Sequence, residues 1–426
     1  MRTDIFPKLG ETLYTHRLEN GLTVQVVPKP GFGKCYAFFA TRYGGMDTRF
    51  RLEGEWQDTP AGIAHFLEHK MFDTEEGNAL QELAANGASP NAFTSNAMTG
   101  YYFECTEKFE ENLKILLSFV SIPYFTAESV DKEQGIIGQE IRMIEDDPEW
   151  RVYMALMECL YARHPVRTSV AGTVESIRQI THETLYACHK AFYHPANMVL
   201  TVAGDVDHRR VVELVERSLP KTGGVEIPRD YGGEEPEGSR CAQQTLRMEV
   251  ATPLFQLGYK VTPCADGRER YRQALLGDLA IRAVLGPSSP LYARLYAKGL
   301  INQSFQVSYE DEPGAAFLIA GGESADPHGV RTAVAEEVRR VAAEGLDPVL
   351  WERLKKAAYG NRVRSLNSFE VLCVELAQSY FAGESFFSFP EEYAALTPQD
   401  GVDFIRKNMT AERCGLAVVL PGEGKG

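Results

Sequence analysis

Residues 65–72 read HFLEHKMF and place two histidines and a glutamate within five positions. On an α-helix, positions i, i+3 and i+4 share one face, so His65, Glu68 and His69 point in the same direction. Two imidazoles one turn apart can hold one metal ion, and zinc binds neutral imidazole readily. The alternative is a helix whose two histidines are hydrogen-bonded in a core. We favour the metal, because chance gives roughly 0.03 His-x-x-acid-His matches in 426 residues with 9 histidines and 59 acidic residues.

The residues before this stretch predict that it is helical. Thr59 can cap a helix, and Pro60 suits the first helical position. A catalytic zinc keeps three protein ligands and a water molecule, and Glu68 would lie beside that water as a base. The spacing HxxEH is the reverse of HExxH and is a known signature of zinc peptidases.

A third ligand must come from elsewhere, and residues 129–147, SVDKEQGIIGQEIRMIEDD, supply the candidates. Glu133 and Glu140 are seven positions apart, so they share a helix face with the apolar Ile137 and Ile144. A charged side chain in an apolar stripe needs a partner, and a cation would serve. The spacing does not choose between the two glutamates, and a solvated acidic face remains the alternative.

Strand-like and helical segments alternate along the chain and predict an α+β fold. Segments 22–30 and 35–45 are expected to form an antiparallel pair of strands, followed by a polar loop at 49–58. Further strands are expected at 91–106 and 198–206, and helices at 78–87, 108–122, 129–146 and 208–219.

Residues 222–243 are rich in glycine, proline and charge, which is typical of an exposed linker. We therefore expect a first domain at 1–222, a linker at 223–243 and a second domain at 244–426. The second half repeats the order of the first, with strands at 253–262, 302–310 and 315–323 and helices at 269–286 and 292–300. Eight of the nine histidines lie at or before His208, so only the first domain is expected to bind metal.

The formal net charge of −15 argues against nucleic acid or an anionic membrane as the main partner. The N-terminus has no signal-peptide pattern, and no stretch approaches 18 uninterrupted apolar residues. We expect a cytoplasmic protein without a membrane segment.

Four segments, in this order, carry a resemblance to a known family: AGIAHFLEHKMF, NAFTSNAMTGYYF, EQGIIGQEIRM and YHPANMVLTVAGDV. Together they resemble the M16 zinc peptidases, or inverzincins, which include pitrilysin, insulinase and mitochondrial processing peptidase. The resemblance runs over essentially the whole first half and is looser in the second. It is greatest to the half-length bacterial members that act as dimers. It implies two homologous domains, each an antiparallel-rich mixed sheet with helices on one face, as in the LuxS/MPP-like metallohydrolase fold.

The resemblance also implies roles for single residues. His65, His69 and Glu140 would bind one zinc ion per chain, Glu68 would be the general base, and Glu133 would orient a ligating histidine. An edge strand would pair with the backbone of an extended substrate, and four residues match it: Asn91, Ala92, Phe93 and Thr94. The alternative for these four is an ordinary covered strand.

The function implied is a zinc-dependent endopeptidase that hydrolyses peptides or unfolded segments, as the catalytic subunit of a dimer. Two rival functions are a non-catalytic subunit of a structural or processing complex and a dedicated maturase that removes the leader of one peptide.

The second half departs from the family at residues 288–305, SSPLYARLYAKGLINQSF. Many members carry an arginine and a tyrosine in this region that reach the substrate at a facing zinc site. This chain has Tyr296 at the arginine position and Asn302 or Gln303 at the tyrosine position. We therefore expect a heterodimer with an M16 paralogue that supplies this pair, with a homodimer as the alternative.

Overall fold

The computed structural model describes residues 1–221, 224 and 227–422. It divides into two compact units. Unit 1 holds Met1–Ile141, Thr168–Asp230 and Val363–Phe387, and unit 2 holds Arg142–Arg167, Tyr231–Arg362 and Ser388–Gly426. Each unit thus includes a segment from the other half of the chain. Residues 222 and 223, where the predicted first domain ends and the predicted linker begins, lie outside the described residues, and the division into homologous halves stays a prediction.

Unit 1 is built on a seven-stranded mixed sheet. Its order is β1-β2-β3-β11-β4-β10-β9. The strands are β1 Arg2–Phe6, β2 Glu11–Arg17, β3 Thr23–Pro28, β11 Met198–Gly204, β4 Cys35–Thr41, β10 Thr99–Cys105 and β9 Ser89–Thr94. β11 is parallel to β3 and antiparallel to β4. The expected direct pairing of segments 22–30 and 35–45 is therefore wrong. β11 lies between those two strands in the middle of the sheet, and it is accordingly buried at all seven positions.

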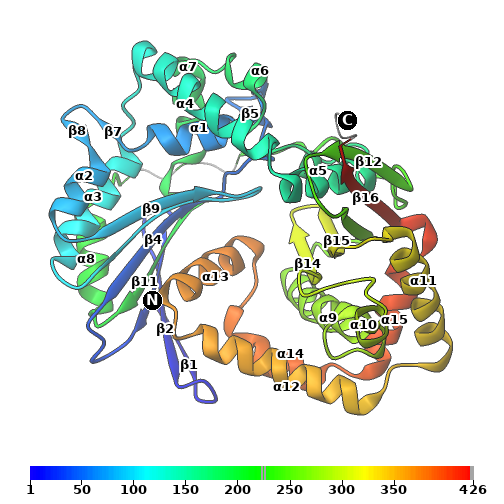
Figure 1. Cartoon of the computed structure of the whole chain (residues 1–426). Coiled ribbons are helices and arrows are strands. Elements are labelled where there is room, and N and C mark those ends of the chain that lie inside the picture. The colour runs from blue at the N-terminus through cyan, green and yellow to red at the C-terminus, as the bar shows by residue number, and fades with distance from the viewer. Residues whose placement is uncertain (222–223, 225–226, 423–426) are drawn as a thin grey trace. The chain divides into compact units, whose positions relative to one another are not determined.

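Helices cover both faces of this sheet (Figure 1). One face packs against α13, Phe369–Ala382, whose Leu372 and Leu376 contact a cluster that includes Phe38 and Val199. The opposite face, with Tyr101 and Phe103, lies against α3 and its neighbours. The helices of unit 1 other than α13 are α1 Ile63–Lys70, α2 Ala79–Ala85, α3 Phe109–Ser121, α4 Ala127–Glu145, α6 Val174–Ile177, α7 His182–Phe192 and α8 His208–Ser218, where α4 runs past the boundary of the unit.

Unit 2 is built on a five-stranded sheet of order β12-β16-β13-β15-β14. The strands are β12 Gln243–Met248, β16 Cys414–Pro421, β13 Leu254–Val261, β15 Ala315–Glu323 and β14 Gln306–Glu312. Besides α13, the helices of the second half are α9 Gly267–Leu285, α10 Pro290–Ala297, α11 Pro327–Glu344, α12 Pro348–Ser365, which ends in unit 1, α14 Phe389–Ala395 and α15 Pro398–Asn408. One face of the sheet forms a core with α9, α11 and α15. The other face packs against α5, Pro148–Leu160, whose Leu156 and Leu160 lie over Gly258. The predicted α+β architecture is confirmed for both halves. Helices are expected on one face of each sheet, but α13 and α5, each from the other half of the chain, cover the second faces.

The helix that carries His65 begins later than the sequence predicts. Gly62, with φ +93°, precedes α1, and the Thr59 hydroxyl donates a hydrogen bond to the Thr48 carbonyl instead of capping the helix. A side chain at position 62 would lie 2.5 Å from the Ala171 carbonyl oxygen, so glycine is required there for both space and backbone angle. The predicted helical start at Pro60 is therefore wrong.

Two other segments differ from expectation. The polar loop at 49–58 is a hairpin of β5, Arg49–Leu52, and β6, Glu55–Asp58. The described part of the predicted linker is divided between the units, with residues 224 and 227–230 in unit 1 and residues 231–243 in unit 2. The latter part is held to unit 2, since Glu235 accepts hydrogen bonds from three backbone N–H groups, at residues 162–164, and from Lys260. Across the described ranges, no helix combines the length and the apolar character needed to cross a lipid bilayer.

Candidate metal centre

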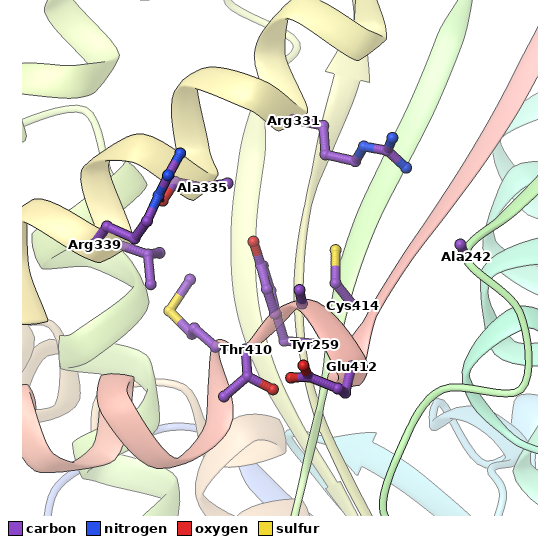
Figure 2. Close-up of a pocket in the computed structure, with 11 residues that line it drawn as sticks. Ala242, Tyr259, Arg331, Ala335, Arg339, Thr410, Glu412 and Cys414 are labelled. Atoms are coloured by element: carbon purple, nitrogen blue, oxygen red, sulfur yellow. The ribbon is translucent and has the colours of Figure 1, made fainter.

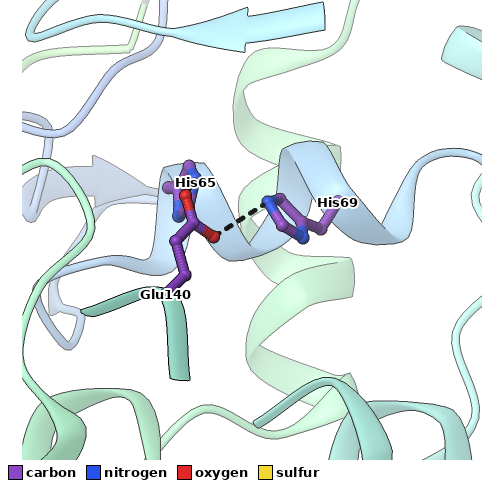
Figure 3. Close-up of side chains that lie close together, drawn as sticks. All are labelled: His65, His69 and Glu140. Atoms are coloured by element: carbon purple, nitrogen blue, oxygen red, sulfur yellow. Dashed lines mark ion pairs between the residues drawn. The ribbon is translucent and has the colours of Figure 1, made fainter. Parts of the chain in front are cut away.

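The three predicted ligands converge in unit 1. Figure 3 shows Glu140 reaching from α4 toward the two imidazoles of α1. His65 Nε2 lies 3.5 Å from one carboxylate oxygen of Glu140, and His69 Nε2 lies 3.6 Å from the other. One ligand atom from each residue lies within 4.8 Å of the other two. All three side chains are partly buried, and Glu140 is the most exposed of them.

These distances fit a metal ion better than direct hydrogen bonds. Two atoms bound to one zinc ion at 2.0–2.2 Å in tetrahedral geometry lie about 3.3–3.5 Å apart. The N···O distances of 3.5 and 3.6 Å are at or beyond the limit for a hydrogen bond. Two imidazoles and one carboxylate are also a ligand set of catalytic zinc sites, with a fourth position left for water. The residues present therefore fit zinc.

Glu133 lies in a different position from Glu140. Its Oε1 is 3.0 Å from His69 Nδ1, so the Nδ1–H donates to this carboxylate and Nε2 is left facing Glu140. The tertiary structure thus gives different partners to the two glutamates, between which their spacing in the sequence could not choose. His65 differs from His69, because its buried Nδ1 has no hydrogen-bond partner among the residues that the structure describes.

Neighbouring charges shift the pKa values of the side chains at the site. Burial lowers the pKa of His69, but the hydrogen bond with Glu133 and the nearby carboxylates outweigh it, so the pKa is raised. The contact with His65 lowers the pKa of Glu140. Burial alone would raise the pKa of Glu133, but His69 and Lys70 lower it overall. Both carboxylates are therefore ionised at neutral pH.

Glu68 lies beside the ligands and is held by the neighbouring strand. The Thr94 hydroxyl donates a hydrogen bond of 2.9 Å to Glu68 Oε2, and the Thr99 hydroxyl donates to Thr94 at 3.3 Å. Glu68 is 8% exposed, and burial raises the pKa of its carboxyl, against the effects of His65 and Thr94. The sequence predicts Thr94 as part of an edge strand that pairs with the substrate, and it gives no sign of the contact with Glu68.

The segment Asn91–Thr94 lies in β9, at the edge of the sheet. β9 pairs with β10 on one side, and no further strand of the described chain pairs with it on the other. Phe93 stacks on Phe38 at one face of the sheet, while Thr94 faces α1. The Thr94 contact thus places one end of this edge strand beside α1, the helix that carries His65 and His69.

The residues at the family's arginine and tyrosine positions are in unit 2. Tyr296, on α10, is about half exposed and stacks on Tyr292. Asn302 donates a hydrogen bond to Glu323, and Arg294 forms a 2.7 Å ion pair with Glu337. Arg294 is therefore already paired within its own unit.

A separate pocket of about 670 Å³ lies in unit 2 (Figure 2). It holds none of the predicted site residues. Its lining comes from α11, β13, the residue before β12 and the chain around the start of β16. The lining residues are Ala242, Tyr259, Arg331, Ala335, Val338, Arg339, Met409, Thr410, Ala411, Glu412 and Cys414.

Comparison with known proteins identifies the family. The model described as Insulinase (Peptidase family M16) matches residues 53–174, and the model described as Peptidase M16 inactive domain matches residues 179–358. The chain is 38% identical over 422 residues to the "Uncharacterized zinc protease YmfH" of Bacillus subtilis, and the match covers 98% of both proteins. The chain belongs to peptidase family M16. The insulinase match includes all the candidate ligands of this M16 chain.

Solved structures agree with this assignment. The M16-like peptidase of Alicyclobacillus acidocaldarius superposes on this M16 chain with a TM-score of 0.92 and 32% identity, covering 97% of this chain and 99% of that one. The periplasmic protease PqqL of Escherichia coli has a TM-score of 0.74 at 17% identity, which supports the fold alone. Here 99% of this M16 chain matches 48% of PqqL, so the chain spans about half of that protein.

Proposed function

We propose that this M16 protein is a zinc-dependent endopeptidase that cleaves peptides or unfolded segments. The observation that carries the proposal is the convergence of His65, His69 and Glu140, with the carboxylate of Glu68 beside them. Relatives that are named zinc proteases support it.

The residues at the site have different roles. His65, His69 and Glu140 would hold one zinc ion, and Glu133 orients the His69 ring through Nδ1. The bound ion supplies polarisation of the scissile carbonyl and a water of lowered pKa. Glu68 takes the proton of the attacking water and passes it to the leaving amine, while the Thr94 hydroxyl holds its carboxylate in place.

The substrate would bind as an added strand on β9. Its outer edge, with which no strand of the described chain pairs, can pair with an extended peptide along Asn91, Ala92, Phe93 and Thr94. The Ala92 N–H, which donates to Asn91 Oδ1, would have to exchange that bond for one to the peptide. Hydrogen bonds to the backbone are common to all peptides, so we expect weak sequence specificity. A folded protein would have to expose an extended segment first.

The test is the hydrolysis of a random mixture of unstructured peptides, followed by mass spectrometry, with zinc measured in the same preparation. We expect one zinc per chain, loss of cleavage after dialysis against a chelator, and recovery when zinc is returned. A preparation that retains no zinc, or cleavage that persists after complete metal removal, would contradict the proposal.

The catalytic unit is proposed to be a heterodimer, because Tyr296, with Asn302 or Gln303, does not offer the family's arginine and tyrosine. The isolated chain is then expected to bind zinc but cleave slowly. Addition of an M16 paralogue that carries this pair should raise the rate in proportion to the complex formed. Full activity of the isolated chain, unchanged by the paralogue, would favour the homodimer instead.

A further inference from the structure

Lys70 is a buried cation immediately after His69. Its side chain is only 3% exposed. Lysine is almost never buried to this extent unless its charge is paired, because removal of an ammonium group from water is costly. The position therefore needs an explanation beyond the helix that it ends.

Two carboxylates surround this ammonium group. Lys70 Nζ forms a close ion pair with Asp73 Oδ2, and it lies 3.8 Å from Glu133 Oε2. The other oxygen of the same glutamate, Oε1, is the acceptor for His69 Nδ1. The two oxygens of Glu133 are thus divided between an ammonium group and an imidazole.

The ammonium group limits the rotation of the Glu133 carboxylate. The terminal torsion of a glutamate is soft, so a carboxylate held by one hydrogen bond can rotate away from its partner. An ammonium group fixed beside Oε2 disfavours that rotation and keeps Oε1 on His69 Nδ1. Asp73, in β7, Asp73–Thr74, also holds the ammonium group through its ion pair.

We propose that Lys70 is a positioning residue for the metal centre. It fixes the orientation of Glu133, and Glu133 in turn fixes the ring and the tautomer of His69, so that Nε2 faces Glu140. The inference rests on the proposed function, since it concerns how tightly the site holds zinc. The competing explanation is that Lys70 only ties α1 to the segment of Asp73 and contributes to folding.

The experiment measures the zinc dissociation constant by competition with a chromophoric chelator. Lys70→Met keeps an unbranched side chain of similar length and removes the charge. Loss of a partner behind a metal ligand typically weakens affinity 10- to 100-fold, and we expect about tenfold for Lys70→Met. Glu133→Gln should weaken affinity at least as much. The double variant should bind zinc no more weakly than Glu133→Gln alone, because Lys70 acts through Glu133.

Lys29→Met is the matched control. Lys29 is also a mostly buried lysine of unit 1, with an 11% exposed side chain paired to Glu11. Its hydrogen bonds go to Glu11 and the Leu366 carbonyl, not to the metal centre. Lys29→Met should lower stability and leave the zinc dissociation constant unchanged.

The outcomes separate the two proposals. If the wild type binds no zinc, the proposed function fails and this inference fails with it. If the wild type binds zinc and Lys70→Met binds it equally tightly, only the inference is overturned. It is also overturned if the losses from Lys70→Met and Glu133→Gln add in the double variant, or if Lys29→Met weakens zinc binding as much. If Lys70→Met does not fold, Lys70→Gln is used in its place. Its double variant with Glu133→Gln is again expected to bind zinc no more weakly than Glu133→Gln alone.

Discussion

Replacement of Thr94 by valine removes one hydroxyl group at nearly constant shape, and it tests how Glu68 is held. The Thr94 hydroxyl donates the one hydrogen bond that Glu68 receives from another side chain within the described ranges. A hydrogen bond to a charged group contributes about 1.5–3 kcal/mol. If that contribution is made fully in the transition state, kcat should fall about 10- to 100-fold.

The assay is the cleavage of an internally quenched peptide by the isolated chain or by its complex with the paralogue, whichever is more active. The kcat, the KM and the zinc content are measured on the same preparation. Thr94→Val should lower kcat and leave KM and zinc content near the wild-type values, because neither the ligands nor the β9 backbone changes. Thr94→Ser keeps the hydroxyl and should recover most of the rate. The reasoning is refuted if Thr94→Val retains wild-type kcat, or if Thr94→Ser is as slow as Thr94→Val.

Two further predictions concern the metal and the fold. Glu140→Gln should weaken zinc retention more than Glu133→Gln, because it alters a ligand instead of a group that orients one; equal loss on dialysis against a chelator would contradict this. Glu235→Gln should lower the free energy of unfolding by about 3 kcal/mol at pH 7, since it leaves the buried Lys260 without its counter-charge. Burial would raise the pKa of Glu235, but Lys260 and backbone N–H groups lower it to about 2. The stabilisation is therefore present above the unfolded pKa of about 4.3 and is lost as the pH falls toward 2, so urea unfolding should show a smaller difference at pH 3. Glu237, whose carboxylate is 83% exposed in its pair with Arg413, is the control, and Glu237→Gln should cost less than about 1 kcal/mol.

The parts of the site that depend on local geometry could be predicted from the sequence. His65, Glu68 and His69 share a face because helix periodicity fixes their directions over one turn. The choice between Glu133 and Glu140 could not be made in this way. It depends on how α4 lies against α1, which is a tertiary arrangement that the spacing of seven residues does not contain.

Long-range pairing explains the errors in the fold. β11 comes more than 150 residues after β4 and lies between β3 and β4, so adjacency in the chain suggested the wrong neighbours. Gly62 stands directly before α1, where the Ala171 carbonyl leaves no room for a side chain, and no local signal reports that contact. Lys70 is similar, since nothing in its immediate sequence distinguishes a buried ammonium group from an exposed one.

The central claim is that the zinc ligands and the base are different residues of one site. The most direct measurement compares Glu68→Gln with the wild type for zinc content and for peptide hydrolysis in the same preparation. Glu68 is not among the three converging ligands, so Glu68→Gln should keep one zinc per chain while the rate falls by orders of magnitude. Loss of zinc from Glu68→Gln, or hydrolysis at the wild-type rate, would contradict the account.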